Sequence, residues 1–189
     1  MKAIYLCLVL LSMFFQSKSQ TVNSELLENK NDTFYLKTTQ LPFTGTAVTS
    51  IANGKTIIST DYIKGVLNGT EITFNSSGGK YSEVHFQNGK FNGLYIQWYE
   101  NGQKEFQKTY KDDYMYGLAE HWYMNGQIQS RGDYENCREE GIWTYWYENG
   151  QKEKEGSYHT ALQQGKWLFW DEKGNLTKEV HYEKGNIIK

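Results

Sequence analysis

The amino-acid sequence predicts an all-β fold, a single-layer antiparallel meander of about six β-hairpin repeats of 24 residues each. Two series of glycines recur with this period, at Gly45, Gly69, Gly93, Gly117, Gly141 and Gly165, and at Gly54, Gly78, Gly102, Gly126, Gly150 and Gly174. Two aromatic series share it, at Tyr62, Phe86, Tyr110, Tyr134, Tyr158 and Tyr182, and at Phe74, Trp98, Trp122, Trp146 and Trp170. Several series with one period and no insertion indicate a repeat array, in which each unit is one supersecondary element.

The composition favours strands over helices. Aromatic residues make up 16% of the 189 residues, and the chain has 18 glycines but one proline. Aromatic side chains pack well on a pleated surface, and glycine accepts the positive φ that tight turns need. A helical bundle would instead be rich in leucine and alanine.

The first 19 residues are predicted to be a signal peptide. Lys2 precedes an apolar run from Ala3 to Phe15, and small residues follow before an expected cleavage near Ser19 or Gln20. The apolar run is shorter than the roughly 20 residues that a membrane-spanning helix needs, although an uncleaved anchor is the alternative. We therefore expect a secreted, periplasmic or outer-surface protein that does not span a membrane after cleavage.

Residues 20–42 form an N-terminal segment outside the repeats, and the array is expected from residue 43 to 188. The stretch TFYLKTTQLPFTG could add a strand that covers the open edge of the sheet. The first unit carries Ser50 where later units carry Trp or Phe, as in a capping repeat.

Each unit is expected to contain a six-residue strand, an Asn-Gly turn and a second strand. Asn-Gly is the strongest short hairpin signal, because both turn positions tolerate positive φ. In the third unit a three-residue loop, with Gly102 in the left-handed region, would place Ile96 beside Phe106 and separate apolar from polar side chains. The sequence thus predicts three-residue turns with a glycine bulge.

The pattern GxWxxWYENGQxxxEGxY, taken from the fifth unit, resembles the MORN-repeat variant family, which is widespread in bacteria. The resemblance covers about three quarters of the chain. It implies a single-layer stack of β-hairpins without a helical core. Some family members are labelled as antitoxins, and related repeats serve as scaffolds or lipid-associated modules.

The residues that could carry chemistry do not form a catalytic or metal-binding constellation. The four histidines do not cluster within the repeat. Cys137 is interpreted as a surface thiol in a connector between two units. Glu153 and Glu155 are expected to be neighbours on one strand face, about 7 Å apart. That separation suits paired glycosidic carboxylates, but the preferred interpretation is a solvated surface. We expect no enzyme activity, no cofactor and no metal.

A binding surface is the remaining hypothesis. Aromatic side chains on the first-strand face opposite the Leu-Ile-Trp stripe form the candidate: Tyr95, Tyr99, Tyr123, Trp143, Tyr145, Tyr147, Trp167 and Phe169. Exposed aromatics beside carboxylates suit a protein partner or a stacked sugar. The alternative is structural, because cross-strand aromatic pairs stabilise a sheet by about 0.2–1 kcal/mol each.

The functional expectation is an exported, non-enzymatic binding or scaffold module, with another protein at the cell envelope as its partner. The first alternative is carbohydrate binding at surface polysaccharide, through Trp143, Tyr145, Tyr147 and Trp167. The second, from the resemblance alone, is an antitoxin or immunity-type protein. The net charge of −2 and the lack of any basic block exclude a nucleic-acid footprint.

Overall fold

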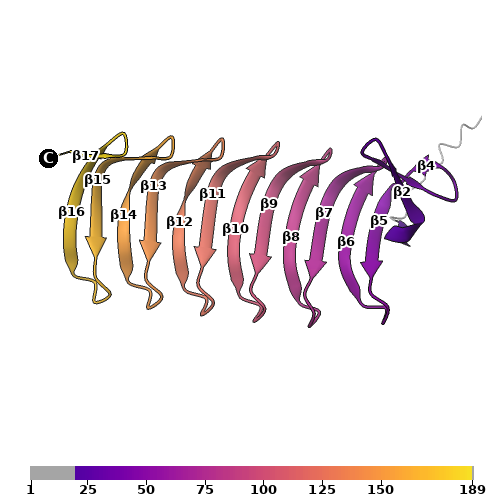
Figure 1. Ribbon diagram of the computed structural model, residues 1–189, viewed down its shortest axis with the longest axis horizontal. Coiled ribbons are helices and arrows are strands. Elements are labelled where there is room, and N and C mark those ends of the chain that lie inside the picture. Colours follow the sequence, from indigo (N-terminus) through magenta and orange to yellow (C-terminus); the bar gives the residue numbers. More distant parts are fainter. Residues whose placement is uncertain (1–19, 189) are drawn as a thin grey trace, which may run out of the picture.

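Fourteen strands stand side by side in one open sheet, which a computed structural model describes over residues 20–188 (Figure 1). Their order is β1-β5-β6 and then sequential to β17, so every consecutive pair from β5 onward is antiparallel. The predicted all-β meander is confirmed. The predicted signal peptide, residues 1–19, lies outside the described residues.

Six hairpins, called units one to six, make up the array, and a short strand follows them. Their strands are β5 (Gly45–Ser50), β6 (Thr56–Ile63), β7 (Val66–Phe74), β8 (Lys80–Gln87), β9 (Lys90–Trp98), β10 (Lys104–Lys111), β11 (Tyr114–Trp122), β12 (Ile128–Glu135), β13 (Arg138–Trp146), β14 (Lys152–His159), β15 (Leu162–Trp170) and β16 (Leu176–Glu183), with β17 (Asn186–Ile188) at the end.

The N-terminal segment caps the first unit. Its elements are β1 (Gln20–Asn23), the 3₁₀ turn η1 (Ser24–Leu26), β2 (Leu27–Lys30), β3 (Thr33–Leu36) and β4 (Leu41–Pro42). Strand β1 pairs in parallel with β5 and covers that edge of the sheet. The stretch TFYLKTTQLPFTG does not supply this edge strand, because β3 and β4 pair with β2 in a separate small sheet. A cluster of buried side chains joins the cap to unit one: Val22, Leu27, Phe43, Ala47 and Tyr62.

The Asn-Gly turns have the predicted three-residue form. In unit three the Tyr99 N–H donates to the Gln103 carbonyl at 2.8 Å, and the Gly102 N–H donates to the Tyr99 carbonyl at 2.9 Å. Gly102 has a φ of +85°, which places it in the left-handed region. The same pair of hydrogen bonds recurs 24 and 48 residues later.

A second bulge just after each turn overturns the predicted pairing of Ile96 with Phe106. Trp98 pairs with Lys104 as expected, but the register then shifts by one residue. Phe106 therefore lies opposite Gln97, and Ile96 lies opposite Gln107. A one-residue shift moves every later side chain to the other face of the sheet. The aromatic residues of the two strands consequently share a face.

The connectors between units are two-residue turns rather than irregular loops. Both central residues have positive φ, the signature of a type I′ turn, for example Asn136 at +50° and Cys137 at +63°. The N–H of the second turn residue donates to a carbonyl of the preceding unit, as Cys137 does to Met115 at 3.0 Å. From unit two onward, the first strands begin before the periodic glycine. That glycine lies at a bulge within the strand, as Gly117 does at φ +81°.

The two faces of the sheet differ in burial. All buried side chains of the array lie on one of them, here called the packed face: Ala47, Thr60, Tyr62, Ser82, Val84, Ala119, Ser130, Trp143, Trp167 and Val180. Trp143 and Trp167 lie over Gly132 and Gly156 of the preceding strands, where a Cβ atom would meet the indole ring. Periodic tyrosines meet these indoles edge-on, with ring centroids of Tyr158 and Trp167 5.1 Å apart.

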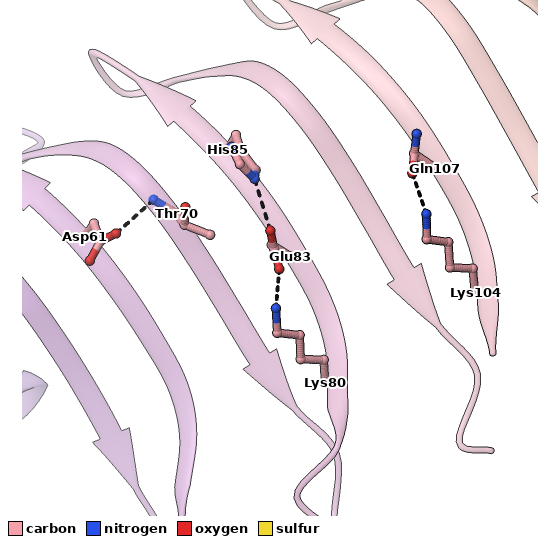
Figure 2. Close-up of polar contacts among 7 residues, drawn as sticks. All are labelled: Asp61, Thr70, Lys80, Glu83, His85, Lys104 and Gln107. Atoms are coloured by element: carbon pink, nitrogen blue, oxygen red, sulfur yellow. Dashed lines mark hydrogen bonds and ion pairs between the residues drawn. The ribbon is translucent and has the colours of Figure 1, made fainter. Parts of the chain in front are cut away.

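The opposite surface, here called the open face, carries the periodic tryptophans and chains of polar contacts. Lys80 contacts Glu83, whose second carboxylate oxygen contacts His85 at 3.1 Å, and Lys104 donates to Gln107 at 2.7 Å one unit later (Figure 2). The bulge after each turn brings residues i and i+3 to the same face, which makes these pairs possible. The Lys80 ammonium also lies 5.6 Å from the centre of the Trp98 ring.

Candidate binding surface

The eight predicted surface residues divide into two groups. Five project from the packed face: Tyr95, Trp143, Tyr145, Trp167 and Phe169. The other three, Tyr99, Tyr123 and Tyr147, stand at the ends of first strands, directly before the three-residue turns. The groups meet different surroundings, so each is described separately.

The three turn tyrosines connect neighbouring units. Their hydroxyls donate to the carbonyls of Trp122, Trp146 and Trp170 at 2.8–2.9 Å. The asparagine of the same turn adds a second link, since the Asn125 side-chain amide donates to the Glu148 carbonyl at 3.0 Å. Because each bond satisfies a carbonyl one unit away, these side chains hold the stack in register.

Trp143 and Trp167 are core residues of the packed face. Their side chains are 4% and 0% exposed. Each indole N–H donates to a backbone carbonyl of the preceding strand at 3.1 Å, to Asp133 and Ser157 respectively. The rings therefore offer almost no surface on which a sugar could stack.

Tyr95, Tyr145 and Phe169 are half-buried, and lysines lie over two of them. The Lys154 ammonium is 4.4 Å from the centre of the Tyr145 ring, and Lys178 is 5.7 Å from that of Phe169. The Tyr145 ring also stacks on Trp143, with centroids 5.9 Å apart. Burial, with a hydrogen bond to the Tyr158 hydroxyl, raises the pKa of Tyr145.

Sequence reasoning missed a polar hollow of about 320 Å³ on the packed face around unit four. It is lined by His121, Tyr123, Gln129, Ser130, Tyr134, Glu139, Trp143, Tyr145 and Glu153, and this set is called the polar hollow below. It forms because the short side chain of Ser130 stands in a row where β10 carries Phe106 and β13 carries Tyr145. The same repeat position carries Ile58, Ser82, Phe106, Lys154 and Lys178 in the other units, so the sequence holds no distinct signal for the gap at Ser130.

The hollow combines carboxylates with neutral polar groups. Burial, followed by the Lys108 ammonium, lowers the pKa of His121, and the Glu105 carboxylate opposes this change. Burial and the nearby Glu139 carboxylate raise the pKa of Tyr134 to about 12. The Tyr134 hydroxyl donates to Glu139 at 3.5 Å. At neutral pH both side chains are uncharged, so the formal charge of the hollow comes from its two glutamates.

The predicted Glu153–Glu155 pair is separated by the sheet. The bulge near Lys152 turns Glu153 into the hollow, whereas Glu155 lies on the open face and accepts from Thr144 at 3.0 Å. Among residues 20–188, no group of three or more His, Cys, Asp or Glu residues is arranged to hold a metal ion. The same residues contain no helix with the length and apolar character to cross a membrane.

Comparison with known families agrees with this repeat geometry. Four consecutive segments match the family model of the MORN repeat variant: residues 91–112, 115–136, 139–159 and 163–184. The chain belongs to the MORN-repeat variant family. Each matched segment of this MORN-repeat protein is one hairpin, from β9–β10 to β15–β16, bounded by type I′ turns. No curated protein matches the chain.

The family assignment bears on function at a coarse level. MORN repeats are generally protein- or membrane-binding modules, and the family is not known for enzyme activity. Units one and two have the same turns and bulges as the matched units, although the family model does not cover them.

Proposed function

We propose that this MORN-repeat protein is an exported, non-enzymatic module that binds another protein at the cell envelope, and that the polar hollow is the centre of its binding surface. The observation that carries the proposal is the hollow itself. It opens the packed face between units four and five and exposes polar groups beside aromatic rings, as the centres of protein interfaces do.

The polar groups of the hollow retain hydrogen-bonding capacity. Among the described residues, the side chains of His121, Gln129 and Glu153 make no hydrogen bond within the protein. At the corresponding place in unit three, Gln97 and Glu105 bond to each other at 2.7 Å. Unit four thus differs from its neighbour in leaving such groups available to a partner.

Export is supported by the character of residues 1–19, which combine a positive start, a short apolar run and small residues before the expected cleavage site. It is tested directly by the N-terminus of the protein recovered from its native host. A mature chain that begins near Gln20 in the envelope or medium supports export, and an intact Met1 in the cytoplasm contradicts it.

Binding is tested by crosslinked capture of partners from the native envelope, followed by mass spectrometry. The blocking variant is Gln129→Tyr, because Tyr81 occupies the equivalent position in unit two and the fold accepts it there. The matched control is Thr177→Tyr, which makes the same change at the equivalent position of unit six, away from the hollow.

A protein captured in stoichiometric amount by the wild type and by Thr177→Tyr, but not by Gln129→Tyr, supports the proposal. Equal capture by all three proteins places the binding surface elsewhere. Recovery of polysaccharide alone replaces a protein partner with a carbohydrate one.

A further inference from the structure

The two carboxylates of the polar hollow lack a cation among the described residues, and both line a hollow that has space for one. Within residues 20–188, neither Glu139 nor Glu153 has a Lys, Arg or His nitrogen within 4.0 Å. Several carboxylates on the open face do have such partners, as in Glu155 with Lys152 at 2.6 Å and Glu120 with Arg131 at 3.6 Å. The hollow therefore holds two half-buried carboxylates without an ion-pair partner in this part of the chain, although the Lys154 ammonium lies over the Tyr145 ring at its border.

Leaving charge partly buried and unpaired costs free energy, which a cationic ligand would recover. A neutral sugar would fill the space but leave both carboxylates uncompensated. It would also lack a stacking platform, since Trp143 is 4% exposed and the Tyr145 ring already contacts Trp143 and the Lys154 ammonium. The chemistry of the hollow thus favours a cation over a saccharide.

The surrounding groups favour a planar cation with several donors. The rings of Tyr123 and Tyr134 and the imidazole of His121 lie around the carboxylates. A guanidinium stacks on aromatic rings and donates several hydrogen bonds in a fixed fork, whereas an ammonium is a compact, strongly hydrated point charge. Arginine is also enriched among the residues that dominate protein interfaces.

We propose that the polar hollow anchors the guanidinium group of an arginine side chain of the partner protein, held between Glu139 and Glu153. This inference rests on the proposed protein-binding function and names the residue that its partner must present. It predicts that the partner exposes an arginine on a surface able to reach the packed face.

The test uses the folded, isotope-labelled mature protein and N-acetyl-arginine-amide as the probe, followed by NMR titration. N-acetyl-citrulline-amide has nearly the same shape without the charge, and N-acetyl-lysine-amide carries the charge without the fork. We expect the arginine probe to shift the signals of Tyr123, Tyr134 and Glu153, with a dissociation constant on the order of 1–10 mM, and to bind more tightly than lysine. Citrulline should leave these signals unchanged.

The matched variant is the double substitution Glu139→Gln and Glu153→Gln, which keeps side-chain size and the acceptor for the Tyr134 hydroxyl. It should weaken arginine binding by about tenfold or more, because each charge-assisted hydrogen bond becomes neutral. Glu155→Gln removes one carboxylate charge from the open face, and it should leave arginine binding unchanged. A proton spectrum with wild-type dispersion establishes that each variant is folded.

The proposal is overturned if arginine and citrulline act alike, if the double variant binds arginine as the wild type does, or if a neutral trisaccharide shifts these signals and arginine does not. The captured partner separates this failure from failure of the proposed function. If the double variant still captures the partner at wild-type levels, the module binds a protein but the arginine anchor is wrong. If the wild type captures no protein at all, the proposed function itself fails.

Discussion

Gly156→Ala is expected to be among the most damaging single-methyl additions to the packed face. Gly156 of β14 pairs with Trp143 of β13 and lies beneath the Trp167 indole of β15, and its φ lies outside the left-handed region. An ideal Cβ at this position would lie 2.2 Å from Cδ2 and 2.3 Å from Cε2 of the indole. Carbon atoms in favourable contact are about 3.5–4.0 Å apart, so the ring or the strand must move by more than about 1 Å.

The ring has little freedom to move. Trp167 is 0% exposed, and Tyr158 and Tyr182 meet it edge-on, with centroids 5.1 and 6.2 Å away. Overpacking a filled core costs about 1–3 kcal/mol. Displacing the indole also strains its hydrogen bond to Ser157, which contributes about 0.5–1.5 kcal/mol. We therefore expect a loss of about 2–4 kcal/mol, which lowers the melting temperature by roughly 5–15 °C for a chain of this size.

The assay is thermal and urea unfolding of the mature protein, followed by circular dichroism and tryptophan fluorescence. The control is the double variant Gly156→Val with Trp167→Tyr, which introduces the two residues, Val84 and Tyr95, that unit two and unit three carry at the same positions of the repeat. It should recover most of the stability that Gly156→Val alone loses. A melting temperature for Gly156→Ala within about 1 °C of wild type, or no recovery in the double variant, would refute the reasoning.

Three further predictions follow from individual contacts. Tyr123→Phe removes the hydroxyl that donates to the Trp146 carbonyl, and it should lower the free energy of unfolding by about 0.5–1.5 kcal/mol in urea. An unchanged urea midpoint would mean that this link between units is dispensable. Thr160 and Ala161 have φ values of +50° and +67°, which strain the backbone of residues other than glycine and asparagine. Replacing them by Asn-Gly should stabilise the protein by about 1 kcal/mol. A lower melting temperature of the variant would contradict this reasoning. His121 has a lowered pKa in the folded protein, so the unfolded chain binds a proton first and stability falls as the pH drops below about 6.5. His121→Gln should therefore lose less stability than wild type between about pH 7.5 and 5.5, and parallel pH profiles would show that this histidine contributes nothing to the change.

The sequence predicts the local backbone structure because each turn and strand pattern recurs in six units. The 24-residue period, the hairpin unit and the three-residue turn with left-handed Gly102 were all predicted. The bulge next to Trp98 is not predictable from the sequence. A bulge depends on how two strands pair, and its position requires no fixed residue type. Without this bulge, Phe106 would lie on the same face as Ile96, and Glu153 would lie on the same face as Glu155. The structure contradicts both expectations.

The candidate surface shows the same division. Its residues were identified as one aromatic group, yet the structure distributes them among buried core rings such as Trp167, links between units such as Tyr123, and half-exposed rings such as Tyr145. The sequence does not predict the polar hollow, because the hollow arises where the small side chain of Ser130 lies beside larger ones. Only the packed sheet places that gap beside side chains from units four and five.

By itself, the sequence determined the repeat, its length and its turns, since these depend on residues close together in the chain and on the φ values that glycine and asparagine accept. The tertiary structure decided which side chains face each other, which rings are buried and where two carboxylates remain without a cation. Those properties depend on strand register, and a shift of one residue exchanges the two faces of a sheet while leaving every local preference satisfied.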